Sequence, residues 1–329
     1  MAKKIINQPE DCVSEALEGF LKAHPAYVQV EGASGLRVKD VQDKPALIVG
    51  GGSGHEPMFG YFVGKNLADA SVAGNVFTSP DPGSILQTAL SVERGKGVLF
   101  VYGNYSGDNM NFDMAAELLA DQGIAVKTVR VWDDVASAPK EQYTDRRGIA
   151  GNALVIKIAG AASSVLDLEG AYRVACKARD QVYSIGFGLS GATIPGEAHP
   201  IFTLPEDEME YGLGIHGEPG VRRVKLQSAD SIVEELVEQI LADSGIQAGD
   251  TVCTLVNGLG ATPLLELYIM NRKLAQLLEE KGIHIYNMDV GNYVTSLEMA
   301  GASVTLMKLD EELKTYYDMP CRSPYYQKG

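Results

Sequence analysis

The sequence predicts an α/β protein with two α/β domains, each a mixed sheet covered by helices. Short apolar runs typical of strands alternate along the chain with segments whose apolar residues recur at helical spacing. Of the 329 residues, 45% are hydrophobic and 22% are charged, so the chain has enough apolar side chains for a sizeable core. At this length one large domain or two are both reasonable.

The N-terminal domain is expected to comprise residues 1–183. Apolar runs closed by glycine or polar turns predict its strands, and apolar residues three or four positions apart predict its helices. In chain order these are strands at 46–49 and 98–102, a helix at 112–119, a strand at 126–132, and helices at 151–162 and 170–183.

The C-terminal domain is expected to comprise residues 184–329, where a second series of elements begins. It contains strands at 184–189, 209–215, 251–256, 284–290 and 303–309, with helices at 232–242 and 263–280. No linker rich in proline, serine or charge separates the two series, so the boundary rests on the order of the elements alone.

Charge and composition exclude several classes of function. With 28 Lys and Arg against 43 Asp and Glu, the net charge is −15, and no basic run would attract nucleic acid or an anionic membrane. The N-terminus lacks the apolar stretch of a signal peptide and no window resembles a membrane span, so a cytoplasmic protein is expected. The four cysteines form no C-x-x-C pair, a spacing that suits neither zinc nor a disulfide framework.

Glycine is unusually abundant. The 36 glycines, about 11% of the chain, exceed the average usage of about 7%. Most of the surplus lies in clusters at or just after the ends of predicted strands, where the backbone turns sharply and a ligand can approach it closely. These clusters are Gly50–Gly54, Gly103–Gly107, Gly212–Gly220 and Gly258–Gly260.

Familiar nucleotide and hydrolase patterns do not fit these clusters. Two matches to G-x-G-x-x-G, beginning at Gly186 and Gly212, lack the helix that dinucleotide binding requires. The chain has no G-x-x-x-x-G-K-[ST] pattern, so it is expected to bind no nucleotide itself. The turn at Gly51–His55 resembles a nucleophile elbow, but His55 stands where the last glycine belongs, which leaves a Ser53 hydrolase as a weak alternative.

Four polar residues lie inside or beside the glycine turns, namely Ser53, His55, Asp108 and His216. Because each of the two histidines adjoins a glycine, both imidazoles are expected to be open to a ligand. Imidazole and carboxylate groups together suit proton transfer on a small polar molecule, or nucleophilic addition by histidine.

Plainer interpretations of the same residues stay open. Asp108 follows a turn and opens an apparent helix, as an N-cap does, and the two histidines can be turn residues bonded to the backbone. Two histidines and an aspartate can also bind a metal, although nothing in their spacing requires one, and no metal is expected. Asp133 and Asp134 are expected to be a solvated loop pair.

Five stretches of the sequence resemble the dihydroxyacetone kinase family. They occur in the family's order, and the resemblance extends essentially from Ile5 to Leu309. The stretches are GGGSGHEP (50–57), FTSPDP (77–82), NYSGDNMNFDMA (104–115), EMEYGLGIHGEPG (208–220) and LVNGLGATPLLELY (255–268).

The resemblance implies a ketose-binding subunit of two α/β domains that forms a homodimer. In such proteins a histidine ring nitrogen adds to the ketone carbonyl as a hemiaminal, and the matching residue is His216. The family's general base, which also hydrogen-bonds the substrate, matches His55, and its substrate-binding aspartate matches Asp108. Gly52–Gly54, which includes Ser53, matches the turn that binds substrate through backbone and hydroxyl groups.

The resemblance also implies partners. The chain looks like the stand-alone K subunit, so a nucleotide (ADP or ATP with Mg) is expected on a separate L subunit that donates the phosphoryl group. In some systems a phosphotransferase system that uses phosphoenolpyruvate recharges that nucleotide. Gly103 stands where many members have a lysine that contacts the substrate. This difference favours either a longer ketose such as a tetrulose or a non-catalytic, ketose-sensing co-activator as the alternative.

Overall fold

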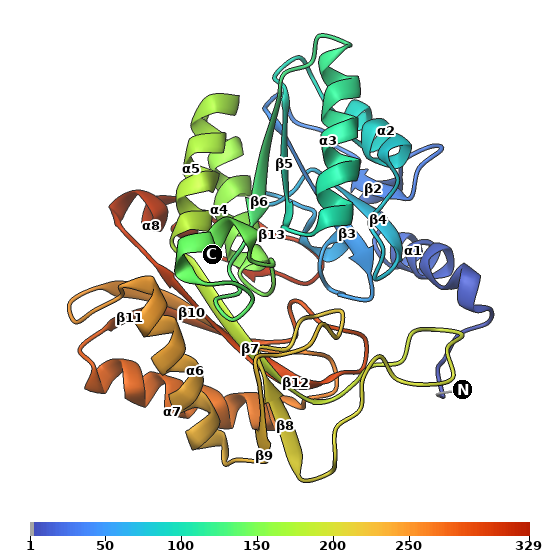
Figure 1. Ribbon diagram of the computed structural model, residues 1–329. Coiled ribbons are helices and arrows are strands. Elements are labelled where there is room, and N and C mark those ends of the chain that lie inside the picture. Colours follow the sequence, from blue (N-terminus) through green and yellow to red (C-terminus); the bar gives the residue numbers. More distant parts are fainter. Residues whose placement is uncertain (1–2) are drawn as a thin grey trace. The chain divides into compact units, whose positions relative to one another are not determined.

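The computed structural model describes residues 3–329 and contains two six-stranded sheets, one in each of two units (Figure 1). The first unit comprises Lys3–Val131, Val155–Ala178 and Leu313–Gly329. The second unit comprises Trp132–Leu154 and Arg179–Glu312.

Neither unit is one continuous stretch of chain. In the second unit, the segment after residue 131 is bonded to β7 (Val182–Ser190), with 2.7 Å from the Ser184 amide to the Asp133 carbonyl. In the first unit, the C-terminal tail exchanges backbone bonds of 3.0 and 3.1 Å between Lys65 and Arg322. The boundary predicted between residues 183 and 184 falls within β7, and the division into those two domains stays a prediction.

The sheet of the first unit has the order β1-β2-β4-β3-β5-β6. Its strands are β1 Tyr27–Gln29, β2 Gly35–Val38, β3 Ala46–Ser53, β4 Ala70–Val76, β5 Val98–Gly103 and β6 Val126–Val131. The last four are parallel to one another, whereas β1 and β2 pair antiparallel. Residues 46–49 of β3 are at most 2% exposed, as expected for a parallel strand covered on both faces.

Six α-helices lie wholly or mostly in this unit (Figure 1). They are α1 Cys12–Ala23, α2 Pro82–Val92, α3 Ser106–Ala120, α4 Asn152–Ser163, α5 Leu168–Asp180 and α8 Glu311–Asp318. Helix α2 begins at a proline, and the Asp81 carboxylate before it accepts a 2.9 Å bond from the Ser84 amide, so its N-terminus is capped.

The sheet of the second unit has the order β11-β10-β12-β7-β8-β9. Its further strands are β8 Glu208–Tyr211, β9 Arg222–Lys225, β10 Thr251–Gly258, β11 His284–Gly291 and β12 Ala300–Lys308. Only β10 and β11 are parallel, so the sheet is mixed. Helices α6 (Ala229–Ser244) and α7 (Leu264–Glu280) pack against each other and against this sheet.

The predicted fold class is confirmed, and every predicted helix and strand overlaps an observed one. The elements that were not predicted include the helices α1 and α2 and several short strands. The clearest example is β4, whose sequence ASVAGNV resembles a loop although the strand lies between β2 and β3 in the sheet. Among residues 3–329, no helix has both the length and the apolar character needed to cross a bilayer.

Two glycines in helices of the first unit provide a matched test of backbone packing. A Cβ at Gly160 of α4 would lie 2.7 Å from the Asn66 carbonyl, whereas a Cβ at Gly19 of α1 meets nothing within 4 Å. We expect Gly160→Ala to lower the free energy of unfolding by about 1–3 kcal/mol. Gly19→Ala should raise it by up to about 1 kcal/mol, since alanine is the better helix former. Urea titrations measure both values, and a stabilised Gly160→Ala protein would contradict the close helix approach.

Candidate functional site

The turns after β3 and β5 lie at the same edge of the first unit's sheet. The two strands are parallel neighbours, but the chain continues from β3 to β4 on one side, while β5 lies on the other. In an open α/β sheet, ligands bind outside the carboxyl ends of the strands at such a switch point. The predicted site residues of this unit therefore lie where the topology favours a ligand site.

The turn after β3 is closely packed on the segment that follows β4. A Cβ at Gly52 would lie 2.8 Å from the backbone nitrogen of Thr78, so only glycine fits there. Gly54 has a φ of +98°, which glycine adopts readily. The Ser53 hydroxyl donates a 2.7 Å bond to the Gly74 carbonyl, which is not a base, so this geometry gives no support to the Ser53 hydrolase.

His55 is covered rather than open. Its side chain is 2% exposed and stacks on the ring of Phe77, with 5.1 Å between ring centroids and 22° between the planes. The prediction that its glycine neighbour leaves this imidazole open is therefore wrong, because a residue distant in sequence covers the ring. Phe77 has a φ of +56°, unfavourable for a bulky residue, so its surroundings determine where its ring lies.

Asp108 lies in the first turn of α3 and is 8% exposed. The N-cap alternative is wrong, since Tyr105 occupies the N-cap position. A carboxylate in the first turn is stabilised by the helix dipole. Burial raises the pKa of the nearby Tyr102 to about 12, with the charges of Asp113 and Asp108 adding to the effect and Arg130 opposing it.

The segment after β4 connects the two turns of the first unit. Phe77 stacks on His55, and the Asn111 amide of α3 donates a 2.8 Å bond to the Pro80 carbonyl. The structure therefore brings the turn after β3, residues 77–80 and the start of α3 together. Gly103, the last residue of β5, is buried, and its carbonyl accepts a 2.9 Å bond from the Tyr105 amide.

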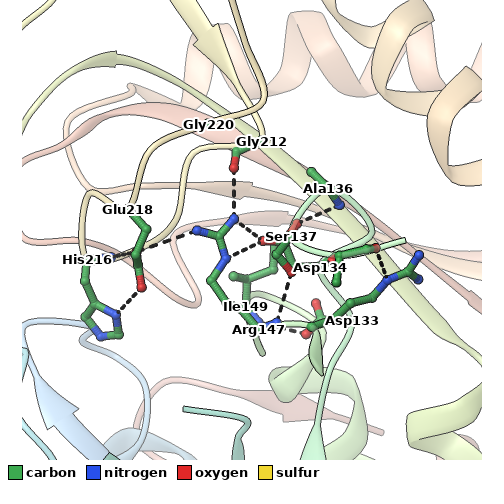
Figure 2. A network of polar contacts seen from close by, with 12 residues as sticks. Asp133, Asp134, Ala136, Ser137, Arg147, Ile149, Gly212, His216, Glu218 and Gly220 are labelled. Atoms are coloured by element: carbon green, nitrogen blue, oxygen red, sulfur yellow. Dashed lines mark hydrogen bonds and ion pairs between the residues drawn. The ribbon is translucent and has the colours of Figure 1, made fainter. Parts of the chain in front are cut away.

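In the second unit, His216 lies in the loop between β8 and β9 and is held by Glu218 (Figure 2). One carboxylate oxygen lies 3.0 Å from the His216 Nδ1, and the other accepts a 2.9 Å bond from the His216 backbone amide. The Glu56 carboxylate likewise accepts a 3.0 Å bond from the Gly54 amide in the first unit. In both turns the glutamate therefore accepts a bond from the amide two residues before it.

Arg147 connects Glu218 to a buried carboxylate (Figure 2). Its Nη1 lies 3.9 Å from Glu218 Oε2, and its Nη2 donates a 2.9 Å bond to the Gly212 carbonyl. Its Nε and Nη2 bind Asp134 Oδ2 at 3.0 and 2.7 Å. A Cβ at Gly214 would collide with both Glu218 and Arg147, so this glycine leaves the space in which they meet.

Asp133 and Asp134 are each 1% exposed, so the prediction of a solvated loop pair is wrong. Asp133 accepts bonds of 2.8 and 2.7 Å from the amides of Ile149 and Gly151. Burial raises the pKa of Asp134 to about 6 against the lowering effect of Arg147, and the charge of Asp133 raises it further. The pair is covered because distant segments fold over it, which a local sequence pattern does not reveal.

Glu218 carries its charge at neutral pH. Burial favours the neutral acid, but the hydrogen bond and charge of His216, with the charge of Arg147, lower the pKa of Glu218 to about 2. The sequence analysis missed Glu218 and Arg147 as site residues. The repeated Glu-Pro after each histidine was a usable signal for Glu218, whereas no signal indicated Arg147.

Across residues 3–329, no three His, Cys, Asp or Glu side chains gather into a group that could hold a metal ion. What the two units offer instead is hydrogen-bonding and proton-transfer chemistry. The first unit presents an imidazole and a carboxylate near a glycine turn, and the second presents an imidazole bonded to a charged carboxylate.

Comparison with known proteins gives consistent similarities. A family model described as the Dak1 domain matches residues 18–325. The dihydroxyacetone-binding subunit of PTS-dependent dihydroxyacetone kinase 2 from Listeria innocua is 44% identical, with 99% of each chain covered. The L-erythrulose kinase of Pectobacterium atrosepticum is 40% identical, with 99% of this chain and 56% of that protein covered. The crystal structure of the dihydroxyacetone kinase of C. freundii has a TM-score of 0.91 and 32% identity, covering 99% of this chain and 60% of that one.

Removing the cation beside Asp134 should destabilise the protein in a pH-dependent way. We expect Arg147→Met to cost about 3–5 kcal/mol of unfolding free energy at pH 7, because it leaves a buried carboxylate without its cation. Without Arg147 the pKa of Asp134 rises further above about 6, so protonation in the folded state should make the loss smaller at pH 5.

The matched control is Lys225→Met, which removes a cation from the exposed ion pair with Asp207 at 2.6 Å. Exposed pairs contribute little, so the control should change the unfolding free energy by less than about 1 kcal/mol at either pH. Urea titrations at both pH values measure the effect, and equal losses for the two variants would contradict the role given to Arg147.

Proposed function

The chain belongs to the Dak1 domain family, and on that premise we propose that it is the ketose-binding subunit of a dihydroxyacetone kinase. The observation that carries this proposal is the similarity to the Listeria innocua dihydroxyacetone-binding subunit, at 44% identity over 99% of both chains. The chain is then the K subunit of a phosphotransferase, and a separate L subunit donates the phosphoryl group. The chain spans only 56% of the L-erythrulose kinase and 60% of the C. freundii dihydroxyacetone kinase. The similarity to these longer kinases therefore supports only the ketose-binding part of the reaction.

His216 is proposed to hold the ketose covalently. Its Nε2 forms a bond to the carbonyl carbon, the π electrons of the carbonyl move to the oxygen, and that oxygen takes a proton from the solvent. The ring keeps its Nδ1 proton and carries the resulting positive charge beside Glu218. Glycerol has no carbonyl group, so this step selects a ketose against glycerol.

His55, Asp108 and the turn at Gly52–Gly54 are proposed to bind a ketose through its hydroxyl groups. Ser53 and the turn's backbone hydrogen-bond the substrate, and Asp108 accepts a hydrogen bond from one of its hydroxyls. His55 takes the proton of the terminal hydroxyl as the hydroxyl attacks the phosphorus atom. The position of these residues at a topological switch point supports this assignment.

The donor side of the reaction is proposed to lie on the partner. A nucleotide with Mg on the L subunit supplies the phosphoryl group and stabilises its charge, so this chain needs no cofactor of its own. The phosphotransferase dependence named for the Listeria innocua relative supports recharging of that nucleotide from phosphoenolpyruvate. We also propose a cytoplasmic homodimer.

A related ketose is the second candidate substrate. The 40% identity to an L-erythrulose kinase favours a four-carbon ketose, and Gly103 leaves out a side chain at the end of β5. The two substrates differ by one hydroxymethyl group, so the size and polarity of the site near Gly103 would discriminate between them.

The covalent step can be tested with dihydroxyacetone labelled with ¹³C at the carbonyl carbon. On binding, we expect the ketone signal to be replaced by that of a carbon with four single bonds, and expect His216→Ala to lose it. His216→Ala should also lower turnover with a cognate L subunit by at least about 100-fold. His284→Ala, at an exposed position on β11, is the control and should behave as the unaltered protein.

Two results of this experiment would contradict the proposal. An unchanged adduct signal in His216→Ala would remove the role of His216. An adduct in the unaltered protein without turnover by any L subunit would instead indicate a ketose-sensing co-activator.

Substrate preference should depend on residue 103. We expect Gly103→Lys to raise the ratio of kcat/KM for dihydroxyacetone to that for L-erythrulose by about tenfold, which corresponds to about 1.4 kcal/mol. A lysine adds a hydrogen-bond donor and occupies space at the end of β5. Gly103→Ala is the control for backbone effects, and equal ratios in Gly103→Lys and the unaltered protein would contradict the assignment.

A further inference from the structure

The contacts of Glu218 constrain which nitrogen of His216 carries a proton. One oxygen of Glu218 faces Nδ1 at 3.0 Å, and the other accepts the backbone amide of the same residue at 2.9 Å. A carboxylate accepts hydrogen bonds and does not donate them. Burial raises the pKa of Glu218, but hydrogen bonding by His216 and the charge of Arg147 at 3.9 Å lower it, so the group stays a carboxylate. In the neutral imidazole, Nδ1 therefore holds the proton.

This tautomer leaves a lone pair on Nε2, the nitrogen that must attack the carbonyl carbon. In the opposite tautomer Nε2 carries the proton and has no lone pair available for a new bond. After the attack, the ring is positively charged and keeps its Nδ1 proton, so a carboxylate beside Nδ1 stabilises the adduct. The contact between Glu218 and Nδ1 thus selects the tautomer of the unreacted His216 ring and also stabilises the charged adduct.

Figure 2 shows that Glu218 is in turn connected through Arg147 to Asp134, and both of these are more deeply buried than Glu218. Arg147 faces Glu218 at 3.9 Å while its other nitrogens bind Asp134, which is 1% exposed. A second bond, 2.6 Å from the Gly220 amide to the Glu210 carboxylate, holds the far end of the same loop. Because Asp134 and the Gly212 carbonyl hold the guanidinium, it limits where the carboxylate of Glu218 can lie.

We propose that Glu218 is the positioning residue for His216, selecting the tautomer with an unprotonated Nε2, and that the Arg147–Asp134 ion pair holds Glu218 in place. This inference rests on the proposed function for its consequence in catalysis, but not for the tautomer itself. Glu218 acts through His216 and does not touch the ketose.

The first test measures the tautomer in the protein without ketose. We use ¹⁵N-histidine labelling and record the chemical shifts of both ring nitrogens at about pH 8, where an ordinary imidazole is neutral. The unaltered protein should show a proton on Nδ1 of His216 alone. In Glu218→Gln, whose side-chain amide also donates, we expect a mixture of both tautomers. A single Nδ1–H tautomer in Glu218→Gln would overturn the proposal.

The second test measures the adduct with ¹³C-labelled dihydroxyacetone. We expect Glu218→Gln to lower the affinity for the adduct by about 10- to 100-fold, and Glu218→Asp, which keeps the charge, to recover part of it. Arg147→Lys should reduce the affinity less than Glu218→Gln does, because the carboxylate remains. Glu235→Gln removes the charge of a partly buried glutamate on α6 that pairs with Arg222 of β9, and as the control it should change neither measurement.

The two tests separate the two proposals. If the unaltered protein forms no adduct but shows the Nδ1–H tautomer that Glu218→Gln loses, the proposed function fails while the positioning role stands. If the adduct forms equally well in Glu218→Gln and the unaltered protein, the positioning role fails and the proposed function is unaffected.

Discussion

The buried carboxyl groups of Asp133 and Asp134 impose the constraint on which the organisation of the second unit depends. A carboxylate removed from water is costly unless hydrogen bonds or a cation stabilise it. Asp133 is stabilised by the amides of Ile149 and Gly151, and Asp134 by Arg147. The bonds that stabilise these two carboxylates hold the segment after residue 131 in one arrangement. They also place the Arg147 guanidinium beside the loop that carries His216.

The neighbouring Arg146 strengthens the same arrangement. It is 3% exposed and binds the Asp243 carboxylate through both terminal nitrogens, at 2.8 and 2.6 Å, so the segment is attached to the end of α6. Two consecutive arginines thus bind different carboxylates, Asp243 and Asp134. Arg146 anchors the segment to α6, and Arg147 connects the buried Asp134 to Glu218.

The first unit organises its polar residues by a different principle. Its parallel strands end at one edge, and glycines there let backbone segments approach more closely than any side chain would allow. The ring of Phe77 and the amide of Asn111 then hold the turn of His55 and the helix of Asp108 to one segment after β4. Backbone topology therefore positions the polar residues of the first unit, whereas ion pairs position the loop that carries His216. The covalent bond proposed for His216 and the proton transfer proposed for His55 are thus assigned to histidines held in different ways.

The sequence by itself determined the fold class, the main strands and helices, and the glycine turns that contain Ser53 and His216, because periodicity and turn chemistry are properties of neighbouring residues. It also indicated His55 and Asp108 as site residues through motifs. Only the tertiary structure decided that Phe77 covers His55, that Tyr105 rather than Asp108 caps α3, and that Asp134 is buried with Arg147. Burial and charge pairing depend on which distant segments meet, and that information is absent from any local stretch of the chain.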